Sequence, residues 1–312
     1  MILFGENISP TFYERIMRIR FTKMHGLGND FILIDCREIS PHDVSAIAQR
    51  LCHRRLGIGA DQLLLLYPSV IADFRMRIVN ADGSEVEMCG NGIRCFAKFI
   101  WDMGLSDKQI IRIETLAGVI RPEKSDGLVK VDMGEPILDK DKIPVDLPEV
   151  QGSIIDYPLV IDDTVFNITC VSMGNPHAVI VVENVSTFPV AYYGPMIENH
   201  HIFPKRTNVE FIEVLNPSEI KMRVWERGSG ETMACGTGAS AVVVASHLKS
   251  LTGKQVTIHL KGGDLFIEWS SDNHVSMTGP ATEVFTGEIE LHEWPRGDSS
   301  SEDRTRKTSI FR

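Results

Sequence analysis

The sequence contains no run of about 18 apolar residues, the length that a membrane-spanning helix needs, and its longest apolar candidates, such as 63–67, have the length of a strand. It has no dense cluster of Lys or Arg, and its formal net charge is −10. A nucleic acid is therefore a poor partner, and anionic membranes would repel the chain. Residues 1–17 lack the basic start and apolar core of a signal peptide. These absences predict a cytoplasmic protein with neither a nucleic-acid nor a membrane partner.

Disulfide and metal-binding patterns are also missing. The 6 cysteines include no Cys-x-x-Cys pair and show no disulfide spacing, which indicates a reducing compartment. The His residues are scattered and none stands at ligand spacing from a Cys, so we expect no metal site. Four cysteines lie in apolar surroundings and are expected to be core or incidental residues: Cys36, Cys52, Cys95 and Cys170.

The chain contains an internal duplication with an offset of 146 residues. Gly28-Asn29 recurs as Gly174-Asn175, and Cys89-Gly-Asn-Gly recurs as Cys235-Gly-Thr-Gly. A length of 312 residues suits two domains, and a composition of 43% hydrophobic and 24% charged residues is typical of a globular enzyme or binding protein. Two half-sites should therefore face each other across a pseudo-two-fold axis, with one thiol on each side of a small ligand.

The residue pattern of each half predicts a strongly curved, mainly antiparallel sheet wrapped around one central apolar helix, an α+β fold of two pseudo-symmetric domains. We expect a hairpin over 18–35 and a helix over 43–55 that is capped by Ser40 and stopped at Gly57. Two buried helices are expected at 93–103 and 238–248. Further strands are expected at 62–67, 74–79, 127–133, 164–171, 208–214 and 265–269.

Pro and Gly punctuation predicts the domain boundaries. The N-terminal half comprises 17–135 together with 281–292 and carries Cys89, and the C-terminal half comprises 136–280 and carries Cys235. Residues 1–16 form an extension, and the Ser- and charge-rich tail 293–312 is expected to be disordered.

Cys89 and Cys235 each stand directly before a Gly-x-Gly that opens a predicted helix. Unpaired N–H groups and the positive end of the helix dipole converge there, so we expect this position to stabilise a thiolate and to lower the thiol pKa from about 8.5. The same helix end can bind a carboxylate. Two facing helices would grip one carboxylate, and one thiolate would remove the α-proton while the opposite thiol returns one. A single such motif would more simply be a small buried thiol in a tight turn, but the second copy in register favours catalysis.

Polar residues accompany the thiols in the same repeat register. Gln62 aligns with Asn208 and Asn80 with Glu226, and Arg227 supplies a fixed cation suited to a second carboxylate. Glu226 and Arg227 could instead be a solvated surface pair. His177 could tune a nearby thiol or could be a satisfied loop histidine.

Seven segments of the chain, in order, resemble the diaminopimelate epimerase family over about residues 17–289. They are Lys23-Met-His-Gly-Leu-Gly-Asn-Asp-Phe31, Asn80-Ala-Asp-Gly-Ser84, Met88-Cys-Gly-Asn-Gly-Ile-Arg94, Gly174-Asn-Pro-His177, Arg206-Thr-Asn-Val-Glu210, Trp225-Glu-Arg-Gly228 and Ala234-Cys-Gly-Thr-Gly-Ala239. The resemblance implies a cofactor-independent isomerase, without pyridoxal phosphate, that interconverts LL- and meso-2,6-diaminopimelate in lysine and peptidoglycan-precursor synthesis. It also implies a homodimer. The segments before Met17 and after His292 fall outside the family pattern, and Met17 resembles the usual start of the family.

The resemblance further implies a role for individual residues. Cys89 and Cys235 match the two acid/base thiols, and the reacting carboxylate would lie on the amides of Gly90, Asn91, Gly236 and Thr237. The substrate-contacting amides would be Asn29, Gln62, Asn80, Asn175 and Asn208. Glu226 and Arg227 would bind the distal amino-acid end, and His177 and Glu226 would adjust thiol acidity.

Two other functions remain open on the sequence. A proline racemase or hydroxyproline epimerase resembles this fold and also uses two thiols, but it needs no distal clamp such as Glu226 and Arg227. A protein of another class, a thiol redox or binding protein, could use Cys89 and Cys235 as a switchable disulfide.

Overall fold

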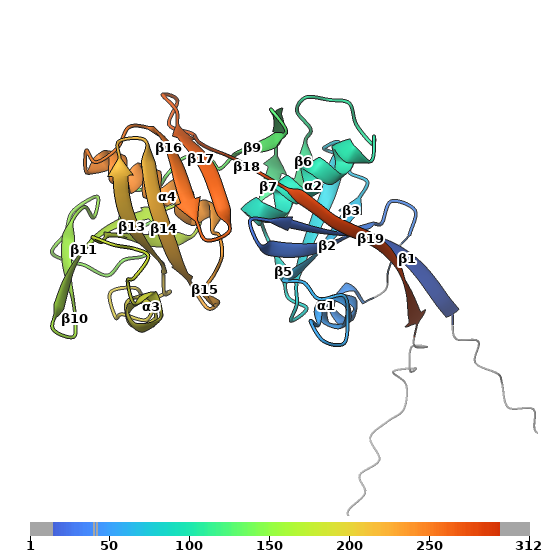
Figure 1. The fold of residues 1–312 in the computed structure, drawn as a ribbon, viewed down its shortest axis with the longest axis horizontal. Helices are drawn as coiled ribbons and strands as arrows, with labels where there is room; N and C mark the ends of the chain where they lie inside the picture. The colour runs from blue at the N-terminus through green and yellow to red at the C-terminus, as the bar shows by residue number, and fades with distance from the viewer. Residues whose placement is uncertain (1–14, 40, 42, 294–312) are drawn as a thin grey trace, which may run out of the picture.

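The computed structural model describes residues 15–39, 41 and 43–293 as two sheet-rich halves joined side by side (Figure 1). The helices are α1 (Val44–Cys52), α2 (Gly90–Asp102), α3 (Val190–Glu198) and α4 (Gly236–Leu248). In these ranges no helix is long and apolar enough to cross a membrane. The α+β class predicted from the sequence is confirmed.

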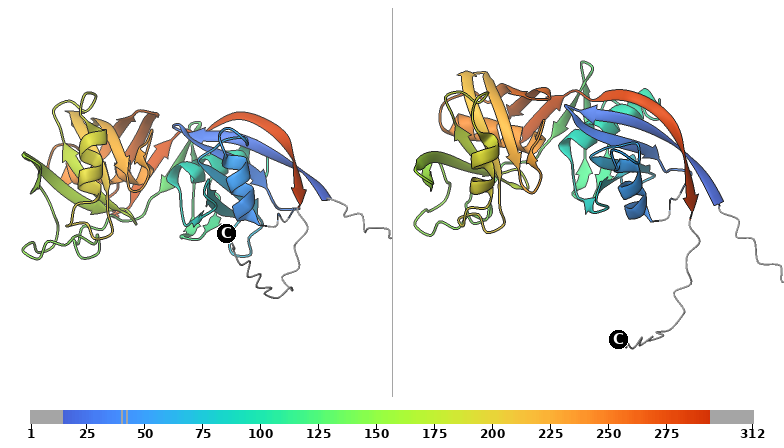
Figure 2. Two further views of the ribbon diagram at one scale, coloured as in Figure 1. Left: turned by 90° about the horizontal axis from the view of Figure 1, so that it is seen from below. Right: turned by 60° about the horizontal axis from the view of Figure 1, so that its bottom comes forward.

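The first sheet has eight strands in the order β19-β1-β2-β3-β4-β6-β7, and β5 pairs with β4. Its strands are β1 (Arg15–Gly26), β2 (Asn29–Asp35), β3 (Gln62–Tyr67), β4 (Phe74–Asn80), β5 (Glu85–Val86), β6 (Ile113–Thr115), β7 (Gly118–Ile120) and β19 (Thr282–Glu293). The predicted hairpin is present, because β1 and β2 pair antiparallel from Thr22↔Leu33 to Gly26↔Asn29. The long antiparallel pair of β1 and β19 runs along this half in both views of Figure 2.

The second sheet has eleven strands in the order β10-β11-β12-β13-β14-β16-β17-β18-β9-β8, and β15 pairs with β14. Its strands are β8 (Glu123–Ser125), β9 (Leu128–Asp132), β10 (Tyr157–Ile161), β11 (Thr164–Ser172), β12 (Pro176–Val181), β13 (Asn208–Asn216), β14 (Glu219–Glu226), β15 (Gly230–Glu231), β16 (Gln255–Leu260), β17 (Gly263–Trp269) and β18 (Val275–Gly279). The six further strands predicted from the sequence all correspond to strands of the two sheets.

The duplication extends to the strand register. Phe31 pairs with Gln62 where β2 and β3 run parallel, and His177 pairs with Asn208 at the equivalent point of β12 and β13. The same offset of 146 residues carries every residue of α2 onto α4. The two halves therefore place equivalent residues at equivalent points of the backbone.

The two central helices share one apolar core. Ile93, Phe96 and Ile100 of α2 belong to the same buried cluster as Val242 and Val243 of α4. Burial of this cluster stabilises the junction of the halves, since apolar area removed from water contributes about 25 cal/mol per Å². The first turns of the two helices are consequently held next to each other at the junction.

The first helix differs from the sequence prediction at both of its ends. The first helix begins at Val44, and its N-cap is Asp43, whose carboxylate accepts a bond of 3.0 Å from the Ala46 amide. Ser40, the predicted cap, lies outside the described residues. The helix ends at Cys52, three residues before the predicted end, and the chain turns tightly at Gly57, where a Cβ would collide with the carbonyl of Arg50.

The helix α3 was not predicted, because Pro189 precedes it and Pro195 lies inside it. Trp225 fixes its position, since a Cβ on Gly194 would collide with the indole ring. The chain crosses from the first sheet to the second between Ile120 and Glu123, and returns between Gly279 and Thr282. Strands β8 and β9 thus pair with the second sheet although they precede residue 135, and the predicted domain division stays a prediction. The tail from residue 294 lies outside the described residues, as does nearly all of the predicted extension.

Candidate active site

The two repeated cysteines are the N-caps of the two central helices. Cys89 caps α2 and Cys235 caps α4, each with extended backbone, at φ −141° and −127°. Each sulfur accepts a hydrogen bond of 3.4 Å from the amide three residues on, that of Gly92 or of Gly238. A Cβ placed on Gly236 would lie 4.0 Å from Cα of Gly90, so the two helix ends nearly touch. Unpaired amides of both first turns therefore converge on one place.

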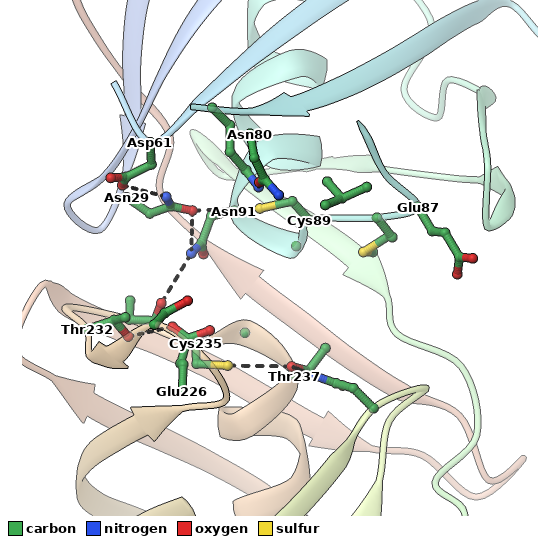
Figure 3. A pocket seen from close by; sticks show the side chains of 18 of the residues that line it. Asn29, Asp61, Asn80, Glu87, Cys89, Asn91, Glu226, Thr232, Cys235 and Thr237 are labelled. Carbon is green, nitrogen blue, oxygen red and sulfur yellow. Dashed lines mark hydrogen bonds between the residues drawn. The ribbon is translucent and has the colours of Figure 1, made fainter. Parts of the chain in front are cut away.

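A cleft of about 1750 Å³ opens between the halves at this place. Figure 3 shows Cys89 on the side of the first sheet and Cys235 across the cleft on the side of the second. Most of the site residues predicted from the sequence line it: Asn29, Gln62, Asn80, Cys89, Gly90, Asn91, Asn175, Glu226, Arg227, Cys235, Gly236 and Thr237. The cleft is larger than the roughly 300–1,000 Å³ of a typical small-molecule pocket, so it is open in this structure.

Amide side chains surround the Cys89 sulfur. Asn29 Oδ1 lies 3.6 Å from this sulfur and accepts a bond of 3.3 Å from the Asn91 side chain. Asp61 accepts from Asn29 Nδ2 at 2.8 Å, which keeps the amide oxygen turned toward the thiol (Figure 3). Asn91 also donates to the carbonyl of Ala234 in the other half at 3.4 Å. The Cys89 sulfur thus has amide groups beside it, and its half-site is tied to the other half-site through Asn91.

Gln62 and Asn80 form a second amide pair on adjacent strands. Gln62 Nε2 donates to Asn80 Oδ1 at 2.8 Å, and Asn80 Nδ2 donates to Ser84 at 2.9 Å. The buried Gln62 Oε1 has no hydrogen-bond partner among the described residues. A buried unpaired acceptor is costly, and Gln62 is one of the residues that line the cleft.

The Cys235 sulfur lies beside a hydroxyl and within the field of two carboxylates, Glu226 and Glu210. The sulfur lies 3.5 Å from the Thr237 hydroxyl, which accepts from Asn175 at 3.3 Å. Behind Asn175, His177 contacts the Asn175 oxygen at 3.0 Å and Glu210 at 2.7 Å, and both His177 and Glu210 are fully buried. His177 does not line the cleft. It therefore reaches the site through Asn175 rather than directly.

Glu226 and Arg227 lie at the same wall but differ in exposure. The Thr232 hydroxyl donates to Glu226 (Figure 3), and burial raises the pKa of this carboxyl. Arg227 is exposed, and its guanidinium donates to the Lys205 carbonyl at 3.2 Å. Its amide donates to Asn208 Oδ1 at 2.9 Å. Asn208 itself is buried and does not line the cleft, so in this open form it supports Arg227.

The predicted lowering of the thiol pKa is wrong for both cysteines. Burial raises the pKa of Cys89, and the amides of Gly92 and Asn91 only partly oppose it. Burial raises the pKa of Cys235 well above its ordinary value, and the charges of Glu226 and Glu210 raise it further. The cost of removing a thiolate from water is therefore larger here than the stabilisation by the helix end.

Three contributors to the site were missed in the sequence: Asp61, Glu210 and Arg94. Glu210 ends one of the seven recognised segments, but nothing in the sequence shows that it lies beside His177. Arg94 also ends one of these segments, but with Lys98 one helical turn further on, nothing in the sequence shows that its charge is buried. Within residues 15–39, 41 and 43–293, no group of three or more His, Cys, Asp or Glu is arranged to hold a metal ion.

Solved structures define the class to which this fold belongs. A phenazine biosynthesis protein of the PhzF family from Bacillus anthracis superposes with a TM-score of 0.64 at 16% identity, over 88% of this chain and 99% of that one. A hydroxyproline epimerase from Agrobacterium vitis, with bound trans-4-hydroxy-L-proline, gives a TM-score of 0.62 at 15% identity, over 89% and 93%. At such identities the likeness shows the fold: the duplicated, two-lobed fold shared by these proteins.

Sequence comparison then narrows the class to one family. The profile of the diaminopimelate epimerase family matches residues 21–138 and 169–284. Diaminopimelate epimerase from Pelotomaculum thermopropionicum is 56% identical over 277 residues, which cover 86% of this chain and 98% of that protein. The enzyme of the same name from Acetivibrio thermocellus is 53% identical over 281 residues, 88% and 100% of the two chains. The chain belongs to the diaminopimelate epimerase family.

Proposed function

We propose that this chain is an isomerase that interconverts LL- and meso-2,6-diaminopimelate by proton transfer between two thiols, as a step of lysine biosynthesis. One observation carries the proposal: two cysteines related by the internal repeat cap two helices whose first turns meet at one cleft. Family membership supports the substrate. The proposal requires no cofactor for the proton transfer.

The paired helix ends bind the carboxylate next to the reacting carbon. The amides of Gly90, Asn91, Gly236 and Thr237 belong to the first turns of α2 and α4, where backbone N–H groups lack helical partners. Glycine at two of these positions lets the ligand approach the backbone closely. When the α-proton leaves, the electron pair of the broken C–H bond spreads into this carboxylate, and the same amides stabilise the added charge.

The thiols exchange a proton across the reacting carbon. One cysteine, as thiolate, forms an S–H bond with the α-proton, and the thiol on the opposite face gives its proton to the carbon, forming the new C–H bond. Charge and atoms balance, because one sulfur gains the proton that the other loses. The centre inverts, and the two sulfurs exchange protonation states in each turnover.

The remaining polar residues bind the distal end and orient the molecule. Asn29, Gln62, Asn80 and Asn175 line the cleft with amide groups suited to a zwitterion, and Asn208 positions Arg227. Arg227 and Glu226 together bind the distal carboxylate and ammonium. Because Arg227 is exposed in this open cleft, we expect closure of the halves to bring it onto the substrate. Glu226 and His177, the latter acting through Asn175, adjust the acidity of the thiols.

The proposal is tested by incubating the purified protein with LL-diaminopimelate, lysine or proline and separating the stereoisomers by chiral chromatography. We expect meso-diaminopimelate and no comparable change in lysine or proline, because a substrate without the distal carboxylate leaves Arg227 unpaired. Arg227→Met should lower turnover of diaminopimelate about 100-fold or more, and circular dichroism checks that the variant folds. Racemised proline would favour the racemase alternative, and no isomerisation of any of the three would favour the redox alternative.

A cytoplasmic homodimer completes the proposed function. All six cysteines are free, and three of them, Cys36, Cys95 and Cys170, lie buried outside the cleft, which suits a reducing compartment. Size-exclusion chromatography with light scattering tests the dimer, and a mass of one chain would contradict it.

A further inference from the structure

Arg94 lies on α2 one turn behind the Cys89 half-site and is completely buried. Its guanidinium donates to the carbonyl of Gly90 at 3.1 Å and to Asn91 Oδ1 at 2.8 Å, both in the first turn of the same helix. It also donates to the carbonyl of Pro280 at 3.2 Å, where the chain crosses between the two sheets. One side chain therefore connects the carboxylate-binding turn to the crossing point of the halves.

Two glycines leave the space that this guanidinium fills. A Cβ on Gly26 of β1 would lie 3.2 Å from the Arg94 Nη2, and a Cβ on Gly279 of β18 would lie 3.3 Å from Nε. Met277 closes the remaining side, with its sulfur 3.4 Å from Nη1. The chamber is thus shaped around a planar group, and a smaller side chain would not fill it.

The partners of Arg94 are all uncharged. Its nitrogens bind two backbone carbonyls, one amide oxygen and one thioether, and no carboxylate in the described ranges forms an ion pair with it. An arginine stays protonated in a protein, and a buried charge without a counter-charge is costly. The anions that this half-site can supply are the Cys89 thiolate and a bound carboxylate.

The other half has no such cation. The repeat counterpart of Arg94 is Ser240, whose hydroxyl donates to the carbonyl of Gly236 at 3.0 Å. Ser240 thus reproduces the bond that Arg94 makes to Gly90 but carries no charge. The positive charge has therefore been placed behind one of the two thiols only.

We propose that Arg94 is a positioning residue of the epimerisation, a buried fixed cation that holds the first turn of α2 and stabilises the negative charge of the Cys89 half-site. The proposal rests on the proposed function, because it assigns Arg94 to the same reaction. The guanidinium fixes Asn91, and Asn91 in turn bonds to Asn29 beside the sulfur. The Arg94 guanidinium also lies behind the amides on which the substrate carboxylate is proposed to bind.

The charges that act on Cys89 come from both halves. Arg94 on α2 favours its thiolate, whereas Glu226 on β14 disfavours it. The thiol of Cys95, also on α2, is buried and its own pKa is raised to about 12, mainly by burial, so it stays neutral. Arg94 is thus the nearby group whose removal should shift the Cys89 titration upward.

The test follows the alkylation of each cysteine by iodoacetamide as a function of pH, with the sites separated by mass spectrometry. In wild-type protein we expect Cys89 to react with a lower midpoint than Cys235. In Arg94→Gln the Cys89 midpoint should rise by about one pH unit or more, and that of Cys235 by clearly less, because loss of a nearby opposite charge has this size. Arg94→Lys keeps the charge and should hold the Cys89 midpoint near the wild-type value.

Activity and a matched control complete the test. Arg94→Gln should lower kcat about 100-fold, whereas Arg94→Lys should recover part of the loss. Ser240→Ala removes a neutral donor at the equivalent position and should leave the Cys89 midpoint unchanged. An unchanged Cys89 midpoint in folded Arg94→Gln, or in wild type a Cys89 midpoint above that of Cys235, overturns the proposal. If wild type fails to isomerise diaminopimelate, the proposed function fails, and the alkylation midpoints still decide the role of Arg94.

Discussion

Cys89 and Cys235 cap helices of equal length, and each accepts a bond of 3.4 Å from the amide three residues on. Their surroundings differ in charge. The second half places Glu226, Glu210 and His177 around its thiol, and the repeat counterparts in the first half are Asn80, Leu64 and Phe31. The first half places Arg94 behind its thiol where the second has Ser240.

This difference shows that the backbone of the site has kept the repeat while the charges have diverged. Burial raises the pKa of both thiols, and Glu226 raises both further, but Glu210 adds to the rise at Cys235 whereas Arg94 opposes the rise at Cys89. Cys89 is therefore expected to ionise first. In a bell-shaped pH dependence, the acidic limb then belongs mainly to Cys89 and the alkaline limb mainly to Cys235.

The largest effect is expected where the halves are equivalent. Cys89→Ala and Cys235→Ala should each lower epimerisation at least about 1,000-fold, because one thiol can remove a proton but cannot return one from the opposite face. Chiral chromatography of the product measures this loss. Cys170→Ala, which removes a buried thiol outside the cleft, is the control and should stay active. Near-wild-type turnover in either cleft variant would contradict the two-thiol mechanism.

The second-largest effect is expected in the pH dependence of activity, where the thiols of the two halves should differ. Glu226 is close enough to raise the pKa of both thiols, and Glu210, on β13, adds to the effect at Cys235. Removing the Glu226 charge by Glu226→Gln should lower the Cys235 pKa, so the alkaline limb of kcat/KM should move to lower pH, by about one unit. Asp132→Asn, which removes another carboxylate that lines the cleft, serves as a charge control. An alkaline limb that stays in place or moves upward in Glu226→Gln would show that this carboxylate does not act on Cys235.

An ion pair that occurs at equivalent points of both halves allows its contribution to stability to be compared between them. Arg77 binds Glu85 just before the Cys89 segment, and Arg223 binds Glu231 at the equivalent point of the second half. The Arg223 side chain is 16% exposed against 30% for Arg77, and it also donates to the carbonyls of Val185 and Phe188.

We therefore expect Arg223→Met to cost about 2–4 kcal/mol and Arg77→Met about 1 kcal/mol in the free energy of unfolding. Urea unfolding measures both losses. A double-mutant cycle that combines Arg77→Met with Glu85→Gln, and a second that combines Arg223→Met with Glu231→Gln, isolate the energy of each ion pair. Equal losses of unfolding free energy in Arg77→Met and Arg223→Met would contradict the expectation that the more buried pair contributes more.

The smallest effect is expected inside α4. Ser246 is fully buried and its hydroxyl has no partner among the residues described, whereas its repeat counterpart in α2 is Ile100. Ser246→Ala should stabilise the protein by up to about 1 kcal/mol, since an unpaired buried hydroxyl is lost. Ser240→Ala on the same helix removes a hydroxyl that is bonded, and should cost about 1 kcal/mol in the same urea unfolding. A loss of stability in Ser246→Ala would show that this hydroxyl is bonded in solution.

The repeat made much of this site predictable from the sequence. Because Cys89 and Cys235 recur in one register with Asn29 and Asn175, the pairing of two N-cap thiols followed from the offset alone. Local patterns say little where tertiary contacts decide. The helix α3 depends on Trp225, and the crossing of β8 and β9 into the second sheet depends on pairing with distant strands.

The thiol acidity could not be predicted for a related reason. A sequence shows that a cysteine precedes a helix, but the depth of its burial depends on the opposing half. Arg94 likewise has an ordinary place in the sequence, and only the chamber made by Gly26, Gly279 and Met277 shows that its charge is buried.

The central claim is that two thiols on opposite faces invert one carbon, and isotope exchange in deuterated water tests it most directly. LL-diaminopimelate is incubated with wild-type protein in deuterated water and stopped at low conversion, and the deuterium content of substrate and product is measured separately by mass spectrometry. The account predicts one deuterium at the inverted carbon of each meso product and none in the recovered LL substrate, because the donor thiol carries a solvent deuteron. Product that retains the original hydrogen, or equal labelling of substrate and product, would contradict it.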